Sequence, residues 1–151
     1  MKLNAKQLRV RRPTQGELRK IERKPIYLVL DDVLDTYNIG SLLRLADAVA
    51  AKGVILCGQT ERPPSSRIHK AAVGTEEWVP WQKSTSSTEV IKNLKTKEVQ
   101  IIAVEQSPKA ISYSSLVISH WSLAIVVGNE TTGVSQEVLG LADTIVELPM
   151  F

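Results

Sequence analysis

The sequence has 151 residues, of which 43% are hydrophobic and 23% are charged, a composition that suits one soluble globular domain with an ordinary core. No apolar run reaches membrane-spanning length, and the basic start lacks a following apolar stretch, so we expect neither a membrane segment nor a secretory signal. The lone cysteine, Cys57, cannot form an intramolecular disulfide, which favours a reducing, cytoplasmic location. Cys57, His69 and His120 share no metal-ligand spacing, so we expect no metal site.

Positive charge is concentrated at the N-terminus rather than spread along the chain. Residues 1–24 contain nine Lys or Arg and two Glu, a net charge of +7, whereas the remaining 127 residues carry −4. A basic arm on a mildly acidic body is typical of a protein that binds a polyanion. The alternative is a solvated or disordered leader that has no binding role.

From residue 26 onward, short apolar runs alternate with helical patterns. Buried strands are predicted at 26–33, 54–58, 99–106, 123–128 and 143–150, with an edge strand at 77–82. The edge position follows from Pro80, which cannot donate to a strand ladder. Helices are predicted at 38–53, 65–72, 86–97 and 135–142. Gly53 is expected to end the first helix and Ser135 to cap the last. This alternation predicts an α/β fold, a mostly parallel sheet with helices on both faces.

The loops that follow the predicted strands are the expected ligand site, because open parallel sheets bind ligands at the carboxyl ends of their strands. These loops read "DDVLDTYNIGSLLR", "EQS" and "GNETTG". None contains G-x-G-x-x-G, G-x-x-x-x-G-K-[ST] or G-x-S-x-G, which argues against dinucleotide binding, P-loop chemistry and a serine nucleophile elbow. From the residues alone we infer an α/β protein with a polyanion-binding arm.

Three patterned segments carry more specific information. "LDDVLDTYNIGSLLRLADAVA" (30–50) places Asn38, Gly40 and Arg44 at fixed spacing ahead of an Ala-Asp-Ala helix. "KAAVGTEEWVPW" (70–81) is a small-residue segment, and "IVVGNETTGVSQEVLGLAD" (125–143) fits G-[NQ]-E-x-x-G-[ILV]-[ST]. In this order and spacing they resemble motifs of the SpoU/TrmH branch of the SPOUT RNA methyltransferases. The resemblance covers residues 26–151 and implies the SPOUT α/β-knot, a fold whose last helix is threaded into a trefoil knot.

The end of the chain departs from the family pattern. In the family, a third motif follows the last strand with a proline, a Ser-Leu-Asn tripeptide and a helix that completes both the knot and the methyl-donor pocket. Here "ELPMF" (147–151) supplies only its opening, so we expect the C-terminal knot element to be incomplete. The expected organisation is a basic arm at 1–24, either RNA-contacting or disordered, and a SpoU-type methyltransferase domain at 25–151.

The resemblance implies transfer of a methyl group from S-adenosylmethionine to a ribose 2′-hydroxyl of RNA, with S-adenosylhomocysteine as product. We expect tRNA as the substrate, a homodimer as the assembly, no contact with membranes and a cytoplasmic location. Two alternatives stay open. The substrate could be ribosomal RNA, or the chain could be a non-catalytic RNA-binding protein of the same fold.

The resemblance also implies a catalytic set of Arg44, Asn38 and Glu130. Arg44 matches the family's proposed general base, but an arginine keeps its proton at neutral pH, so we expect it to hold a phosphate and stabilise the forming alkoxide. The alternative for Arg44 is a surface pair with Asp47. Asn38 would orient Arg44 or the substrate, or cap the helix. Glu130 would lie near the donor, or would be a helix-entry carboxylate favoured by the helix dipole.

The implied methyl-donor pocket draws on three loops, with Gly128 allowing the donor to lie against the backbone and Gly133 permitting the turn into the helix. The backbones of Leu148 and Met150 match positions that meet the adenine in the family. The donor-binding set is completed by Val104, Glu105 and Asn129. For Val104, strand core is the simpler interpretation.

RNA contacts are expected from the basic arm and from the loops near the first motif. The predicted RNA-binding residues are Arg9, Arg11, Arg12, Tyr37 and Arg67. Trp78 and Trp81 could stack on bases, but packing at the edge strand is the favoured interpretation.

Overall fold

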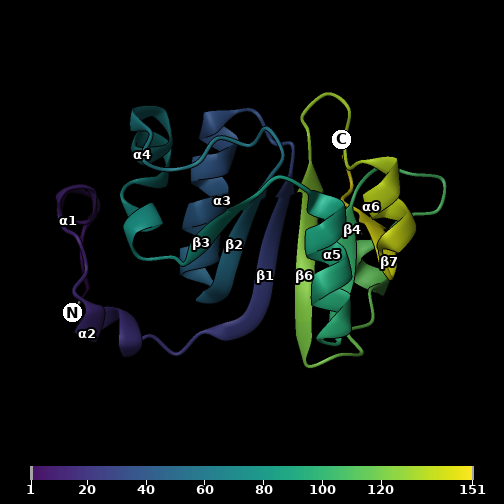
Figure 1. Cartoon of the computed structure of the whole chain (residues 1–151), viewed down its shortest axis with the longest axis horizontal. Coiled ribbons are helices and arrows are strands. Elements are labelled where there is room, and N and C mark those ends of the chain that lie inside the picture. The colour runs from purple at the N-terminus through teal and green to yellow at the C-terminus, as the bar shows by residue number, and fades with distance from the viewer. Residues whose placement is uncertain (1, 151) are drawn as a thin grey trace.

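Seven strands form one sheet in which every pairing is parallel, in the order β3-β2-β1-β6-β4-β7-β5. The computed structural model describes residues 2–150 (Figure 1). The strands are β1 Lys24–Asp31, β2 Ala51–Cys57, β3 Trp81–Ser84, β4 Val99–Val104, β5 Ile111–Ser112, β6 Ser122–Gly128 and β7 Thr144–Glu147. The predicted α/β class with a mostly parallel sheet is therefore confirmed.

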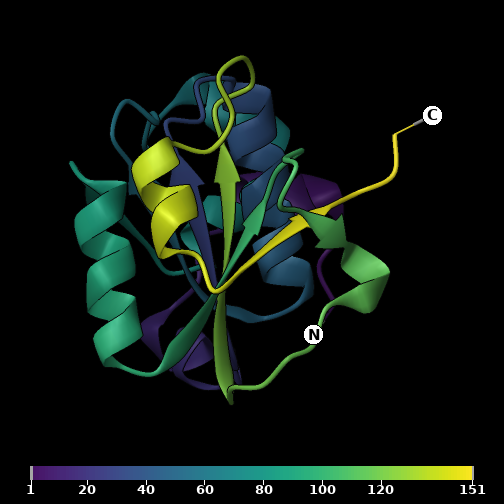
Figure 2. The same ribbon diagram turned by 90° about the vertical axis from the view of Figure 1, so that its right-hand side faces the viewer.

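Helices cover both faces of this sheet. Helices α5 and α6 lie on one face and α3 lies on the other (Figure 2). The helical elements are α1 Ala5–Val10, α2 Gln15–Arg19, α3 Thr36–Ala48, α4 Ser66–Ala72, η1 Thr75–Glu77, α5 Ser87–Thr96, η2 Tyr113–Ser115 and α6 Gln136–Leu141. None of the helices within residues 2–150 is long and apolar enough to cross a membrane.

The core is split by the sheet into two apolar clusters, as the alternation of side chains along a strand requires. Leu28 and Leu30 of β1 point to one face and pack with α3 and α4. Val29, between them, points to the other face and packs with α5 and α6. Cys57 lies in this second cluster, and burial raises the pKa of its thiol to about 12, helped by the nearby Asp31 carboxylate. The thiol is therefore protonated and unreactive at neutral pH.

Four sequence predictions about these elements were inaccurate. Gly53 does not end the first helix. That helix ends at Ala48 with Val49 as its C-cap, Ala50 then turns the chain with a φ of 52°, and Gly53 lies inside β2. The edge strand begins at Trp81 rather than at residue 77, because the residues before Pro80 form a 3-10 turn. Ser135 precedes α6 as expected, but its side chain makes no capping hydrogen bond. The strand predicted at 143–150 is only Thr144–Glu147.

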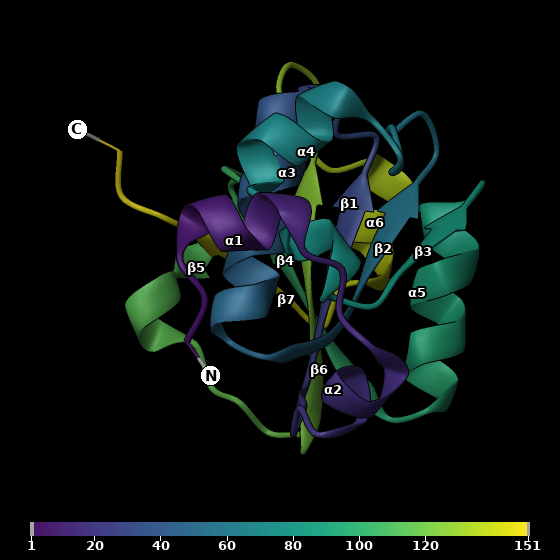
Figure 3. The same cartoon turned by 90° about the vertical axis from the view of Figure 1, so that its left-hand side faces the viewer.

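The basic arm forms two short helices that pack against the body, which the sequence analysis did not predict although their capping boxes are visible in the sequence. Each begins with a capping box, Asn4 with Gln7 in α1 and Thr14 with Glu17 in α2. Helix α1 lies beside α4 on the outer side of the body (Figure 1 and Figure 3). The carbonyl of Leu8 lies so close to Gly74 that a side chain there would clash. The division into an arm at 1–24 and a methyltransferase domain at 25–151 stays a prediction.

The segment after β7 leads away from the sheet. Residues 148–150 extend past β5 toward solvent (Figure 2). The trefoil knot stays a prediction. The short strand β5, which pairs with β7, was missed because two residues are too few to show a periodic pattern.

Candidate functional site

The loop after β6 is hydrogen-bonded to the loop before α3 through the carboxylate of Glu130. Its Oε2 accepts a hydrogen bond from the backbone N–H of Leu34 at 3.0 Å. Its Oε1 accepts from the N–H of Asp35 at 3.0 Å and from Asn38 Nδ2 at 3.1 Å. The two motifs, more than 90 residues apart in sequence, therefore meet at one side chain, as the parallel pairing of β1 with β6 requires.

The same hydrogen bonds keep the carboxylate of Glu130 ionised. Burial by itself would raise the pKa of Glu130, but the hydrogen bonds from Leu34, Asn38 and Asp35 outweigh it and hold the pKa below its usual value of 4.5. The carboxylate stays ionised at neutral pH, and its hydrogen bonds orient the neighbouring loop. It does not lie at the start of its own helix, α6, which begins six residues further on. It lies instead at the N-terminus of α3, whose N-cap residue is Asp35, so the dipole of α3 also favours its negative charge.

Asn129 stabilises the fold of the same loop. Its Oδ1 accepts from the N–H groups of Thr131 and Thr132 at 2.9 and 3.0 Å, and its Nδ2 donates to the carbonyl of Asp32 at 2.9 Å. Backbone hydrogen bonds in both directions join Asn129 to Gly133. The side chain of Asn129 thus ties its own loop to the adjacent one.

A small cavity of about 260 Å³ lies between these two loops. It is lined by Val33, Asn38, Ser41, Leu42, Val127, Gly128 and Glu130. Three of these, Asn38, Gly128 and Glu130, were predicted site residues. A side chain at Gly128 would meet the backbone of Gly133 and Val134, so the glycine is required for the closure of its own loop. The predicted contact of Gly128 with a methyl donor stays a prediction.

Arg44 and Tyr37 lie outside this cavity, on an exposed face of α3. Tyr37, Ser41 and Arg44 are spaced i, i+4 and i+7, so they share one face of the helix, and Ser41 joins that face to the cavity. The alternative pair of Arg44 with Asp47 is not among the ion pairs within residues 2–150. Burial raises the pKa of Asp47, partly offset by the charge of Arg23.

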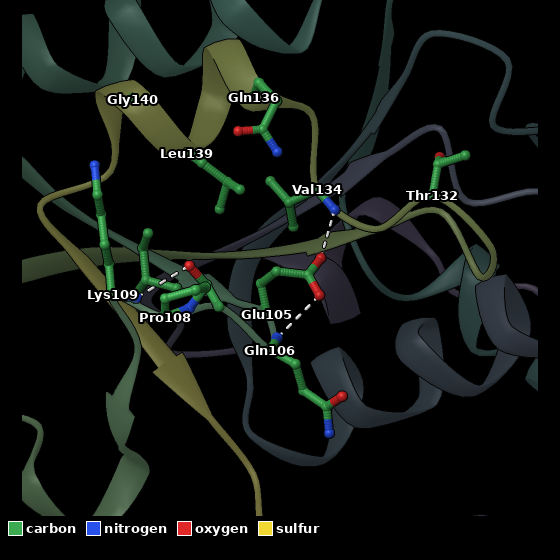
Figure 4. Close-up of a pocket in the computed structure, with 11 residues that line it drawn as sticks. Glu105, Gln106, Pro108, Lys109, Thr132, Val134, Gln136, Leu139 and Gly140 are labelled. Atoms are coloured by element: carbon green, nitrogen blue, oxygen red, sulfur yellow. Dashed lines mark hydrogen bonds between the residues drawn. The ribbon is translucent and has the colours of Figure 1, made fainter.

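A larger cavity of about 530 Å³ lies on the other side of the β6–α6 loop (Figure 4). Its walls are the segment 105–109 after β4, the loop residues Thr132 and Val134, and the α6 side of the sheet. Glu105 lines this cavity, and its predicted contact with the methyl donor stays a prediction. Its Oε2 accepts from the N–H of Val134 at 2.7 Å and its Oε1 from the N–H of Gln106 at 2.9 Å.

The other predicted donor-binding residues do not line this cavity. Val104 ends β4 and pairs with Val146 of β7, which agrees with the simpler interpretation of a strand residue. Leu148 and Met150 are 52% and 78% exposed, on the segment that leads away from the sheet. Sequence reasoning missed Gln106, Lys109 and Leu139, three lining residues for which neither motif nor spacing gave a signal.

The predicted RNA-binding arginines do not share one set of contacts: some form ion pairs and others are exposed. Arg11 forms an ion pair with Glu17 inside the arm, and Arg12 lies 3.7 Å from Glu77. Arg9 and Arg67 are exposed. A further arginine, Arg23, is structural, because it donates to the carbonyls of Ala51 and Trp78 at 3.1 and 2.6 Å. Within residues 2–150 no cluster of His, Cys, Asp or Glu could hold a metal ion.

The fold and these loops define an α/β protein whose candidate ligand cavities lie at the carboxyl ends of parallel strands. The chain belongs to the SpoU rRNA Methylase family, which matches residues 25–151. The resemblance inferred from the three motifs is thereby confirmed.

Known proteins agree with this assignment. The chain is 30% identical over 134 residues to the 23S rRNA (guanosine-2'-O-)-methyltransferase RlmB of Neisseria meningitidis serogroup B, covering 89% of this chain and 53% of that protein. An AdoMet-bound rRNA methyltransferase from Sinorhizobium meliloti is 27% identical, with a TM-score of 0.76 over 95% of this chain and 51% of the other. The TrmH/SpoU tRNA modifying enzyme of A. aeolicus shares the fold at 24% identity, with a TM-score of 0.76 over 97% and 70%. The chain spans about half the length of the curated relatives that it matches.

Proposed function

We propose that the chain transfers a methyl group from S-adenosylmethionine to a ribose 2′-hydroxyl of RNA. The observation that carries this proposal is the contact of Glu130 with Asn38, which joins the first and second family motifs at the carboxyl ends of β1 and β6. Family membership supports RNA methylation, and the 2′-O position is supported by the relative from Neisseria meningitidis, whose name includes it.

The residues around the larger cavity fit S-adenosylmethionine. Val134, Leu139 and Ile145 offer an apolar wall for the adenine, and Lys109 offers a cation for the carboxylate of the methionine part. Glu105 is an acceptor for the ribose hydroxyls or the ammonium group. When bound, the donor supplies an electrophilic methyl group on a sulfonium, which passes to the ribose oxygen and leaves S-adenosylhomocysteine and one proton.

The chain's own residues then position the RNA. Asn38, held by Glu130, presents its amide to the small cavity, where it can bind the ribose. The exposed guanidinium of Arg44 holds the neighbouring phosphate in two parallel hydrogen bonds and stabilises negative charge on the oxygen. Glu130 is not the proton acceptor, because its oxygens already accept three hydrogen bonds and its pKa is lowered.

We propose tRNA as the substrate, with the basic arm as part of the RNA-binding surface. Ribosomal RNA is the second candidate, favoured by the 30% identity to a 23S rRNA enzyme. We further propose a homodimer, because α3 and the segment after η2 expose large apolar side chains, among them Leu45, Val117 and Trp121 at 51%, 72% and 90%. A cytoplasmic location is proposed from the single reduced cysteine.

Calorimetric titration with S-adenosylmethionine, followed by methyl transfer to tRNA and rRNA transcripts, tests the function. We expect donor binding and a 2′-O-methyl mark on tRNA. A mark on rRNA alone would select the second substrate, and RNA binding with no donor binding would show a non-catalytic protein. Size-exclusion chromatography with light scattering measures the molar mass of the assembly in solution. A monomer at all concentrations would contradict the proposed homodimer.

A further inference from the structure

A third cavity, of about 580 Å³, lies between the N-terminal arm and α4, away from both loops of the proposed transfer site. We call it the arm cavity. Its walls come from arm residues 9–12, the segment 63–66 that leads into α4, and the side chains of His69, Glu76 and Trp81. The sequence motifs and the proposed methyl transfer leave this cavity without a role.

Glu76 gives the arm cavity a specific chemical character. Its side chain is only 5% exposed, which is unusual for a carboxylate and requires hydrogen-bond partners. His69 Nδ1 provides one partner, at Oε1. The second oxygen, Oε2, is buried and has no donor within the described part of the chain. A buried acceptor left unpaired destabilises a fold, so a ligand that brings an N–H donor to this oxygen would gain binding energy.

The other walls suit a nucleotide. Trp81 of β3 is half-buried and contributes an aromatic surface, next to Pro63 and Pro64. Arg9 and Arg12 lie on the arm side of the cavity, where both are exposed and can meet a phosphate. The ion pair of Arg12 with Glu77 is long, at 3.7 Å, and the Arg12 side chain is 83% exposed. Such an exposed pair is weak, so it does not prevent Arg12 from binding a phosphate.

We propose that the arm cavity binds a guanine nucleotide of the RNA, outside the transfer site. This inference rests on the proposed function, because it deepens how RNA is recognised. An unpaired base in RNA is read by stacking on an aromatic side chain and by hydrogen bonds along its Watson–Crick edge. Guanine presents two adjacent donors on that edge, N1–H and the N2 amino group, and a carboxylate is the matching acceptor. Adenine has no donor at N1.

The proposed nucleotide site is shared between the arm and the body. The base lies against Trp81 and Glu76, which belong to the body, while the phosphate meets Arg9, which belongs to α1. Both halves of the site are therefore present only when α1 is seated beside Gly74. The arm thus contributes to recognition of a particular nucleotide as well as to general attraction of the RNA backbone.

Calorimetric titration of the whole chain with GMP and with AMP tests the proposal. We expect GMP to bind roughly tenfold more tightly, since a good carboxylate or amide contact to a base edge discriminates by about that factor. Glu76→Gln should remove this preference. Glu89→Gln, which changes the same charge at an exposed position on α5, should keep it. Equal affinity of the unaltered chain for the two nucleotides would overturn the proposal, as would an unchanged preference in Glu76→Gln.

A second variant is independent of any effect of Glu76 on folding. Arg9 is exposed, so Arg9→Gln should fold normally and should reduce the advantage of GMP over guanosine. Arg19→Gln on α2, outside the cavity, is its control. An undiminished advantage in Arg9→Gln would refute the phosphate contact. GMP preference without donor binding or methyl transfer refutes only the proposed function, whereas methyl transfer without GMP preference refutes only the arm cavity as a nucleotide site.

Discussion

Replacement of Glu130 with glutamine tests whether this side chain organises the site or takes part in proton transfer. The carboxylate accepts hydrogen bonds from the N–H groups of Leu34 and Asp35 and from Asn38 Nδ2. Glutamine has nearly the same size but only one acceptor oxygen, so its amide group must face at least one of these donors. The loop before α3 should therefore loosen while the rest of the sheet stays intact.

The expected loss of stability is modest because Glu130 is exposed. A hydrogen bond to a charged group contributes roughly 1.5–3 kcal/mol when shielded from water. Screening by solvent reduces the combined loss here to about 1 kcal/mol. In a domain of this size that corresponds to a fall of about 2–4 °C in Tm. Glu137→Gln, at an exposed position with no side-chain hydrogen bond within residues 2–150, is the matched control and should change Tm by less.

The pH dependence of this difference follows from the lowered pKa of Glu130. Because the pKa is lower in the folded chain than in the unfolded one, the carboxylate stabilises the fold fully above the unfolded value of about 4.5. That contribution decreases as the pH falls from 4.5 through the folded pKa. Thermal denaturation should therefore separate Glu130→Gln from the unaltered chain at pH 7, and the two Tm values should converge as the pH falls below 4.5 through the folded pKa. Equal Tm values at pH 7 would refute the hydrogen-bonding role.

Kinetics separate positioning from proton transfer. If Glu130 positions Asn38, Glu130→Gln should lower kcat by about 10- to 100-fold, a range typical of a misplaced group, and should leave the shape of the pH–rate profile unchanged. If Glu130 were the base, the variant would lose an ionisation from that profile. The loss of a rising limb in the variant would contradict the positioning role.

Three further variants follow from the geometry. In Gly40→Ala the new methyl would lie 2.5 Å from Ala71 Cβ and 2.7 Å from Ala72 N, so the free energy of unfolding should fall by about 2 kcal/mol. Gly140→Ala, where the methyl meets open space, is the control and should be neutral or stabilising. Equal effects of the two substitutions would refute the close packing of α3 on α4. Arg44→Lys should leave Tm unchanged and lower the methyl-transfer rate at least tenfold, and near-full retention of the rate would refute two-hydrogen-bond phosphate binding. Replacing the exposed Lys6, Arg9 and Arg12 with Gln should lower the salt dependence of RNA binding by about 2 in the log–log slope, and an unchanged slope would exclude the arm from the RNA surface.

The strands and the larger helices could be predicted from sequence because their patterns are local. A run such as 26–33 is apolar on both faces since it is central in a parallel sheet, and the pattern alone reveals this. The arm helices α1 and α2 have six and five residues, too short to be stable alone. Capping boxes stabilise both helices, and the contact of Leu8 with Gly74 also stabilises α1. The capping boxes are visible in the sequence, but the contact with Gly74 is a tertiary contact that no local pattern reports.

The sequence indicated which residues to consider for the candidate site better than it indicated how they contact one another. The resemblance to the family motifs pointed to Asn38 and Glu130, and the structure brings them to 3.1 Å because β1 and β6 are neighbours. Nothing in the spacing could show that Glu105 would meet the N–H of Val134, because that contact depends on β4 lying beside β6 in the sheet. For the same reason Gly128 was interpreted as a donor contact, although its position is required first by the closure of its own loop.

The β6–α6 loop is the wall that the two candidate ligand cavities share. On one side Glu130 holds the loop before α3, and on the other side Glu105 holds the N–H of Val134. Between these anchors the loop closes through Asn129 and Gly133, whose φ of 72° a side chain would strain. The loop therefore has little freedom to move on one side without moving on the other. Gly128, Gly133 and Glu130 of the second motif therefore act together: the glycines allow the loop to close, and Glu130 fixes the side of the loop that faces α3.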